Sequence, residues 1–214
     1  MNDGDVVVHL IDDDQMFRRA LAAMLEAAGY AVEQYASAGE FLLQDAPRAP
    51  GCIILDLQMP GPSGLELHEA LARRRDSLPV VFLSGYGDVP TTARAMKTGA
   101  VDFLTKPVQR DMMLAAVQAA IRRDANRRTK ERQKREVQSR FTSLSAREAQ
   151  IFWSIVDGKV NKQIARDLNI AERTVKTYRA QMMLKMRARS VAELARMATE
   201  LEPDDARSGQ AARA

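Results

Sequence analysis

The chain has 214 residues, 46% of them hydrophobic and 28% charged, which is enough apolar material for one large or two modest globular domains. A single cysteine, Cys52, and two distant histidines, His9 and His68, exclude an internal disulfide, a thiolate zinc cage and a histidine-rich metal site. No apolar run approaches the ~20 residues that cross a bilayer, and the first residues lack the features of a secretory signal. We therefore expect a cytoplasmic protein with no membrane partner.

The net charge of +4 conceals two halves of opposite sign. Residues 1–121 carry 10 Lys and Arg against 16 Asp and Glu, whereas residues 122–214 carry 22 against 12. A basic half beside an acidic half indicates a polyanionic partner for one part of the chain only. Two solvated surfaces of different sign are the alternative.

In the acidic half, strands alternate with helices. Short apolar runs with β-branched residues predict five strands, at residues 6–11, 31–36, 52–57, 79–84 and 100–105. Asp14 is a candidate cap of the first helix, and Ser37 with Glu40 forms a capping box for the second. Apolar residues at helical spacing predict helices at about 17–28, 38–44, 65–75, 88–98 and 110–122. Five βα units predict an α/β fold, a parallel sheet with helices on both faces.

The polar residues of this half fall where the strands end. Asp12 and Asp13 follow the first strand, Asp56 closes the third, Ser84 ends the fourth and Lys106 ends the fifth. In an open parallel sheet these carboxyl ends converge on one crevice, at the point where the strand order reverses. Carboxylates ~4 Å apart repel by roughly 4 kcal/mol at an effective dielectric of ~20, so the three acids need a cation, and carboxylate oxygens suit Mg²⁺. The alternative is that acids at strand ends serve only as turn formers or helix caps.

This set of residues resembles the receiver domain of two-component response regulators over residues 6–121, and the stretch FLSGYGDVPTTARAMKTGAVDFLTKP resembles the FixJ subgroup of that family. The resemblance implies a flavodoxin-like, five-stranded, doubly wound sheet. It also implies that Asp56 accepts a phosphoryl group from a sensor histidine kinase. An Mg²⁺ ion would be held by Asp12, Asp13, Asp56 and the backbone carbonyl of Gln58.

The same resemblance assigns phosphoryl binding and switching to Ser84, Phe103, Lys106 and Pro107, the last preceded in the family by a cis peptide. Independently, a carboxylate can attack phosphorus, and phosphoryl transfer mainly needs positioning and charge neutralisation. We expect Ser84 to move toward the new phosphoryl oxygens and Phe103 to turn inward into the vacated space. A plain core aromatic is the alternative for Phe103.

Residues 122–140 hold 9 basic and 3 acidic residues and no Pro or Gly. This composition predicts an extension of the preceding helix, and the scarcity of apolar residues predicts a solvated spacer that packs in no core. A direct phosphate-contacting arm is the alternative.

The basic half has the pattern of closely spaced helices. Ser145 and Glu148 form a capping box, and Asn161 caps the short helix that follows. A tight turn then leads to a longer basic helix at about 172–187, and a fourth helix covers about 190–201. Short helix, turn and longer basic helix form the helix-turn-helix arrangement, whose second helix enters the DNA major groove. Its buried side should hold Val175, Met182 and Met186, with Tyr178 beside them.

This half resembles the LuxR/NarL type of DNA-binding domain, a four-helix, all-α fold, over residues 141–202. The shared features are Leu144, Glu148, Gly158, Asn161, Lys162, Ile164, Ala165, Thr174, Val175 and Lys176. Two positions depart from the family pattern. Ala171 stands where a Ser or Thr usually caps the recognition helix, and Tyr178 stands where a His is common.

The resemblance implies that the partner is double-stranded promoter DNA. Lys176 and Thr177 are the candidates for base-edge contacts, and Arg173 lies on the same side of the helix. Phosphate contacts are expected from Lys162, Thr174, Arg179 and Lys185. Each basic residue taken alone is equally well explained as a solvated charge.

We expect a phosphorylation-dependent transcription factor that dimerises, binds promoter DNA and acts with RNA polymerase. That it activates transcription, and does not repress it, is implied by the resemblance alone. The polar tail, residues 203–214, should be disordered. One alternative is a protein-binding signalling module. Another is a phosphatase of the haloacid dehalogenase kind, but that class needs a second acid two residues after the nucleophile, where this chain has Gln58.

Overall fold

The computed structural model describes residues 6–44, 49–73, 77–85 and 89–201. The chain divides into two compact units, and the division falls between Arg128 and Thr129. The expected disordered tail, residues 203–214, lies outside the described residues. Among the helices of the described segments, none combines the length and the apolar character that crossing a bilayer requires.

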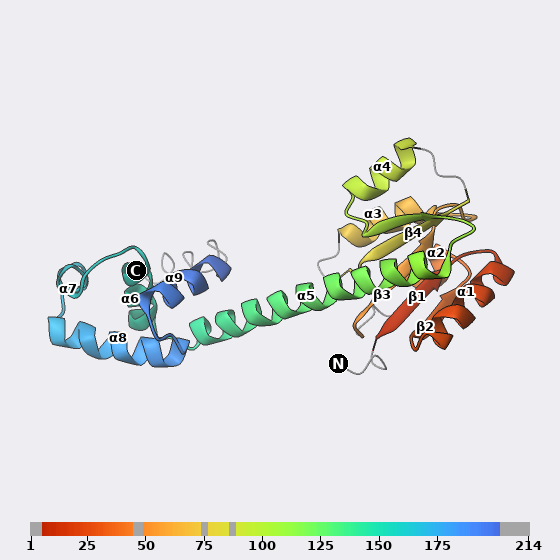
Figure 1. Ribbon diagram of the computed structural model, residues 1–214. Coiled ribbons are helices and arrows are strands. Elements are labelled where there is room, and N and C mark those ends of the chain that lie inside the picture. Colours follow the sequence, from red (N-terminus) through yellow and green to blue (C-terminus); the bar gives the residue numbers. More distant parts are fainter. Residues whose placement is uncertain (1–5, 45–48, 74–76, 86–88, 202–214) are drawn as a thin grey trace. The chain divides into compact units, whose positions relative to one another are not determined.

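The first unit is built on a parallel sheet with the strand order β2-β1-β3-β4-β5 (Figure 1). The strand order reverses at β1, which pairs with β2 on one side and β3 on the other. This confirms the predicted doubly wound, five-stranded architecture. The strands are β1 (Val7–Ile11), β2 (Ala31–Tyr35), β3 (Gly51–Asp56), β4 (Val80–Ser84) and β5 (Asp102–Thr105).

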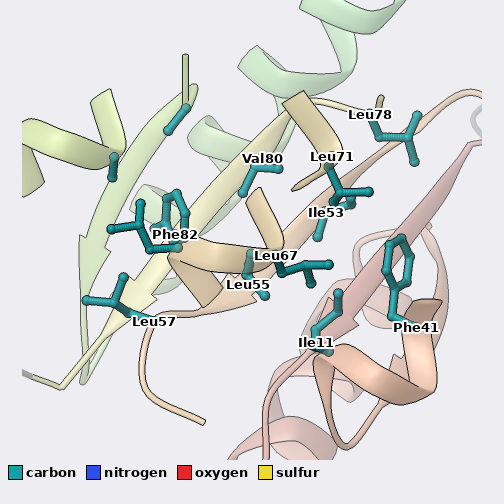
Figure 2. Packing of buried hydrophobic residues seen from close by; sticks show 14 of the residues in the cluster. Ile11, Phe41, Ile53, Leu55, Leu57, Leu67, Leu71, Leu78, Val80 and Phe82 are labelled. Atoms are coloured by element: carbon teal, nitrogen blue, oxygen red, sulfur yellow. The ribbon is translucent and has the colours of Figure 1, made fainter. Parts of the chain in front are cut away.

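Helices cover both faces of this sheet. Residues of α1 (Gln15–Ala27) and α5 (Arg110–Thr142) share one core cluster with the sheet. Residues of α2 (Ala38–Leu42), α3 (Gly64–Ala72) and α4 (Val89–Lys97) share the other, part of which Figure 2 shows. Because both faces are covered, β3 is buried along its whole length, as the apolar run from Cys52 to Leu55 predicts.

Successive residues of β3 serve opposite faces of the sheet. Ile53 and Leu55 pack with the α2–α4 side, whereas Cys52 and Ile54 pack with the α1–α5 side. Burial raises the pKa of the Cys52 thiol to about 12, so this cysteine is an inert apolar residue of the core.

Helix α5 runs without a break through residues 122–140, as their composition predicts, but two buried residues in this stretch contradict the expectation of a spacer that packs in no core. Asp124 is fully buried in the first unit, where Arg127 and Arg128 each reach its carboxylate at 2.6 Å. Val137 is buried in the core of the second unit. The mostly polar composition of the stretch did not indicate that Asp124 and Val137 are buried. A single buried residue is enough to pack one turn of a helix against a core.

The second unit packs four helices and the end of α5 around one apolar core, confirming the predicted all-α domain. The helices are α6 (Ala146–Val156), α7 (Asn161–Leu168), α8 (Glu172–Met186) and α9 (Val191–Glu200). Between α7 and α8 the chain turns at Asn169, which adopts a left-handed conformation with φ of 51°. The buried side of α8 holds Val175, Met182 and Met186, as predicted.

The N-terminus of α7 differs from the prediction. Asn161 is the first helical residue and not the cap, and Val160 occupies the cap position. A valine side chain has no oxygen that could accept a hydrogen bond from the first turn of the helix. The side chain of Gln163, in that first turn, instead accepts the backbone N–H of Val160 at 3.0 Å. Asn161 is thereby left to accept a hydrogen bond from Arg179.

Candidate functional site

Four charged side chains meet at the carboxyl ends of the strands. Asp12 directly follows β1 and Asp56 is the last residue of β3, the strand beside it. Carboxylate oxygens of Asp12, Asp13 and Asp56 lie within 4.8 Å of one another. Lys106, the residue after β5, reaches the same point. We call these four residues the acidic cluster.

Lys106 bridges the two buried acids of the cluster. Its Nζ lies 2.7 Å from Asp12 Oδ2 and 3.0 Å from Asp56 Oδ2. Burial alone would lower the pKa of the Lys106 ammonium, but the hydrogen bonds to both carboxylates outweigh burial and raise that pKa above its ordinary value. Lys106 therefore stays charged at neutral pH.

One ammonium ion does not balance three carboxylates. Burial raises the pKa of Asp56, and the hydrogen bond from Lys106 offsets only part of this effect. Asp12 and Asp56 are buried, whereas Asp13 is exposed, so the cluster is open to solvent on one side. A set of hard carboxylate oxygens with remaining negative charge fits Mg²⁺, which binds proteins through few carboxylates and keeps several waters.

The other predicted residues of this site lie around the cluster. Ser84 is the fully buried last residue of β4, and its carbonyl oxygen accepts the Lys106 N–H at 2.8 Å. Gln58 is exposed, with its backbone N–H 3.4 Å from Asp56 Oδ1. Pro107 follows Lys106 through a cis peptide bond.

Phe103 lies on β5 and contacts the core on the α2–α4 side of the sheet. Its ring centroid is 6.3 Å from that of Phe82, which is fully buried. Phe103 itself remains partly exposed, in contrast to a plain core aromatic such as Phe82.

Gly64 brings the start of α3 against the end of β3. A Cβ atom at this position would lie 2.1 Å from the carbonyl oxygen of Asp56, which no side chain tolerates. Ser63 and Glu66 close the helix start as a reciprocal capping box. The backbone of Asp56 is therefore held from the α3 side by a contact that only glycine allows.

In the second unit, the side of α8 opposite the core is polar and exposed. It presents Arg173, Lys176 and Thr177, while Thr174 is half-buried. Lys162 near the start of α7 is also exposed. The side chains of Lys162, Arg173, Lys176 and Thr177 are therefore accessible to a ligand as large as DNA.

Two of the predicted phosphate contacts have partners inside the unit. Lys185 Nζ lies 2.6 Å from Glu148 Oε2, and Arg179 donates to Asn161 Oδ1 at 3.0 Å. Burial alone would raise the pKa of Glu148, but hydrogen bonds from Lys185 and Ser145 hold it below its ordinary value. Lys185 therefore has a structural role that the sequence did not indicate.

Comparisons with known proteins match both units. The family described as response regulator receiver domain matches residues 8–118, and the family described as bacterial regulatory proteins, luxR family, matches residues 142–198. The chain is 47% identical to the transcriptional regulatory protein FixJ of Azorhizobium caulinodans, over 89% of this chain and 90% of that protein. The chain belongs to the response regulator family.

Further similarities cover most of this response regulator. It is 43% identical to nodulation protein W of Bradyrhizobium diazoefficiens, over 91% of this chain and 86% of that protein. The solved structure of the response regulator StyR aligns with a TM-score of 0.81 and 39% identity, covering 92% of this chain and all of the other. Full-length FixJ from B. japonicum aligns with a TM-score of 0.55 and 37% identity, over 92% and 97% of the two chains.

These matches make the protein a transcription regulator of a two-component system, with a receiver domain and a LuxR-type DNA-binding domain. A receiver domain implies a sensor kinase as partner, and a LuxR-type domain implies DNA binding. Receiver domains generally bind Mg²⁺ through acidic residues, and the acidic cluster of this response regulator is such a set.

Sequence reasoning missed several residues that build these sites. Gly64 follows Ser63 at the start of a predicted helix, a position where a glycine signals close packing of two backbones. The Glu148–Lys185 ion pair joins residues 37 positions apart, and no local pattern indicates such a pair. Nor does any local pattern indicate that the Lys106 ammonium lies over the ring of Phe17, 4.4 Å from its centroid.

Proposed function

We propose that Asp56 accepts a phosphoryl group from a sensor histidine kinase, and that this modification switches on DNA binding. In the proposed assignment the receiver domain spans residues 6–121, the basic helical linker 122–140 and the DNA-binding domain 141–202. The observation that carries the proposal is the acidic cluster, in which three carboxylates and one ammonium ion meet at the strand ends.

The proposed transfer uses the Asp56 carboxylate as nucleophile. One of its oxygens attacks the phosphorus atom, the phosphorus–nitrogen bond of the kinase phosphohistidine breaks, and the bonding electron pair leaves with the imidazole. Asp12, Asp13, Asp56 and the Gln58 carbonyl would hold Mg²⁺, which when bound neutralises charge on the transferring group. Lys106 supplies a second positive charge beside Asp56.

The proposed switch uses two residues that flank the cluster. The Ser84 hydroxyl donates a hydrogen bond to the new phosphoryl oxygens, and Phe103 turns inward behind it. The partial exposure of Phe103 supports this movement, since the ring contacts the core without being enclosed by it. The face formed by α4, β5 and α5 then rearranges and becomes a dimer contact.

The proposed output is promoter binding by a homodimer in the cytoplasm, followed by activation with RNA polymerase. Base edges are read by Lys176 and Thr177, with Arg173 beside them. Pairing two DNA-binding domains roughly doubles the phosphate contacts and so increases both affinity and salt dependence. Phosphate contacts come from Lys162, Thr174, Arg179 and Lys185, the last two shared with the internal partners described above.

Phosphorylation and DNA titration together test this function. The full chain is treated with acetyl phosphate and Mg²⁺, and its mass, oligomeric state and affinity for a DNA duplex selected by the treated protein are measured. Wild type should gain one phosphoryl group, dimerise and bind more tightly, and Asp56→Asn should do none of these. Glu26→Gln, at an exposed acid on α1 outside the proposed dimer face, is the matched control. Equal affinity and stoichiometry for treated wild type and Asp56→Asn contradict the proposal.

FixJ of Azorhizobium caulinodans carries the name of a transcriptional regulatory protein, and the residue two positions after Asp56 argues against a phosphatase. An aspartate-dependent phosphatase of the haloacid dehalogenase kind uses an acid there as proton donor, whereas Gln58 cannot donate in that way. The turnover we assign to Asp56 is limited to slow hydrolysis of its own acyl phosphate. Absence of multiple turnover on a generic phosphate ester is the expected result.

A further inference from the structure

The Lys106 ammonium has a third contact besides the two carboxylates. It lies over the ring of Phe17, 4.4 Å from the ring centroid. A cation within about 6 Å of an aromatic centroid is attracted by the negative face of the ring. Phe17 lies in the first turn of α1 and has no part in the function proposed above.

The position of Phe17 is set by the acids next to it. Asp14 caps α1, and its Oδ1 accepts the backbone N–H groups of Met16 at 2.9 Å and Phe17 at 3.1 Å. The backbone N–H of Asp14 in turn donates to Asp12 Oδ1 at 2.9 Å. Asp12 and the start of α1 are thus joined by successive hydrogen bonds, which fix the backbone of Phe17 relative to the cluster.

A second residue of α1 strengthens this connection. Arg18 donates a hydrogen bond from its guanidinium to the backbone carbonyl of Asp12. The Phe17 side chain is partly buried and packs against the core shared by α1 and α5, and this packing restricts its movement. Two neighbouring residues of α1 therefore contact the cluster, one through the ammonium of Lys106 and one through the backbone of Asp12.

This arrangement matters because a lysine side chain is long and flexible. Two of the Lys106 contacts are acids that Mg²⁺ and the phosphoryl group would also use, so those groups, when bound, would compete with Lys106 for both carboxylates. The ring of Phe17 is an uncharged partner that no metal ion or phosphoryl group competes for. It can keep the ammonium in place while the carboxylates exchange partners.

We propose that Phe17 is a positioning residue for phosphoryl transfer, holding the Lys106 ammonium between Asp12 and Asp56 by contact with its ring face. The proposal rests on the proposed function of Asp56. A ring that merely fills space is replaceable by any apolar side chain of similar size, whereas a ring that holds a cation is replaceable only by another aromatic ring.

The test compares Phe17→Leu, which removes the ring, with Phe17→Tyr, which keeps it, in the full chain. Met24→Leu, two turns along the same helix and packed against the same core, is the matched apolar control. Rates of Asp56 labelling by acetyl phosphate with Mg²⁺ are measured by mass spectrometry. Phe17→Leu should be slower by about fivefold, and Phe17→Tyr and Met24→Leu should stay within about twofold of wild type.

A spectroscopic measurement reports on the contact itself. In wild type and Phe17→Tyr, ring currents should shift the NMR signals of the Lys106 methylene groups next to Nζ, and Phe17→Leu should lose this shift. Thermal unfolding of each variant shows whether it is folded, and Phe17→Met replaces Phe17→Leu if that variant is not.

The outcomes separate the two proposals. Equal labelling rates for wild type and the ring-less variant, or an unshifted Lys106 signal in wild type, overturn the role of Phe17 while leaving Asp56 as acceptor. No labelling of wild type overturns the proposed function and the role of Phe17 with it. A slower ring-less variant, with Phe17→Tyr and the Met24 control unchanged, supports the positioning role.

Discussion

The carboxylate of Asp124 accepts a hydrogen bond from the backbone N–H of Gly51, 3.1 Å away in space and 73 positions earlier in the chain. The same carboxylate is bound by Arg127 and Arg128, and Arg128 also donates to the carbonyl oxygen of Ala49 at 2.7 Å. Helix α5 is in this way anchored to the first residue of β3, at the end of the sheet opposite the acidic cluster.

Removing the Asp124 carboxylate should destabilise the receiver domain. Asp124→Ala leaves the buried Gly51 N–H without its acceptor and two arginines without their shared anion, a loss of about 3 kcal/mol. Urea unfolding of the full chain, followed in β3 by hydrogen exchange, measures the change. Asp111→Ala, at a 94% exposed acid on the same helix, should change stability by less than about 0.5 kcal/mol. Equal effects of the two substitutions contradict a structural role for Asp124.

Adding one methyl group at Gly64, at the start of α3, should displace the backbone of Asp56 and so disturb the acidic cluster. Its Cβ would lie 2.1 Å from the Asp56 carbonyl oxygen, so either α3 or the end of β3 must move. We expect Gly64→Ala to lose about 1–3 kcal/mol of stability and to slow labelling of Asp56 by acetyl phosphate. Gly39→Ala is the control, because a Cβ there meets only the Ser37 hydroxyl, at 3.8 Å. Normal labelling of a folded Gly64→Ala protein would show that this contact does not position Asp56.

Lys162 and Lys185 should respond to substitution in different ways. Lys162→Ala should weaken binding to a DNA duplex and reduce the slope of log affinity against log salt by about 1, with unchanged stability. Lys185→Ala leaves the Glu148 carboxylate, only 3% exposed, without its cation, so the second unit should lose about 2 kcal/mol. Fluorescence of Trp153, the only tryptophan, follows unfolding of that unit. Identical behaviour of the two variants contradicts these assignments.

Receiver stability should decrease below about pH 6.5 because of two buried histidines. His9 and His68 are the only histidines, and burial is the main cause that lowers the pKa of each. The unfolded chain takes up protons near pH 6.5 while the folded chain does not, so each histidine reduces stability by at most about 1.4 kcal/mol per pH unit as the pH falls.

Unfolding curves between about pH 7.5 and pH 5.5 check this dependence, and the double variant His9→Gln, His68→Gln should remove it. The second unit contains no histidine and serves as an internal control. If the unfolding free energy of the wild-type receiver changes with pH in the same way as that of the double variant, the prediction is wrong.

The sheet and the acidic cluster could be predicted from the sequence because their signals are local. Apolar runs mark the buried strands, and the residues that end those strands must converge in a parallel sheet. The predicted strand and helix boundaries agree with the structure to within a few residues, and α5 continues through the linker as the composition of residues 122–140 predicts. The sequence predicts Asn161 as the cap of α7, because asparagine is a much stronger N-cap than valine, whereas in the structure Val160 occupies the cap position.

By itself, the sequence determined the order of the elements, the two-domain plan and the set of residues at the strand ends, all of which follow from periodicity and residue type along the chain. Only the tertiary structure decided which groups meet across elements: the Asp124 carboxylate with the backbone N–H of Gly51, and the Glu148 carboxylate with the Lys185 ammonium. The physical reason is that an ion pair depends on separations of a few ångströms between elements, whereas a residue pattern specifies only which face of its own element a side chain occupies.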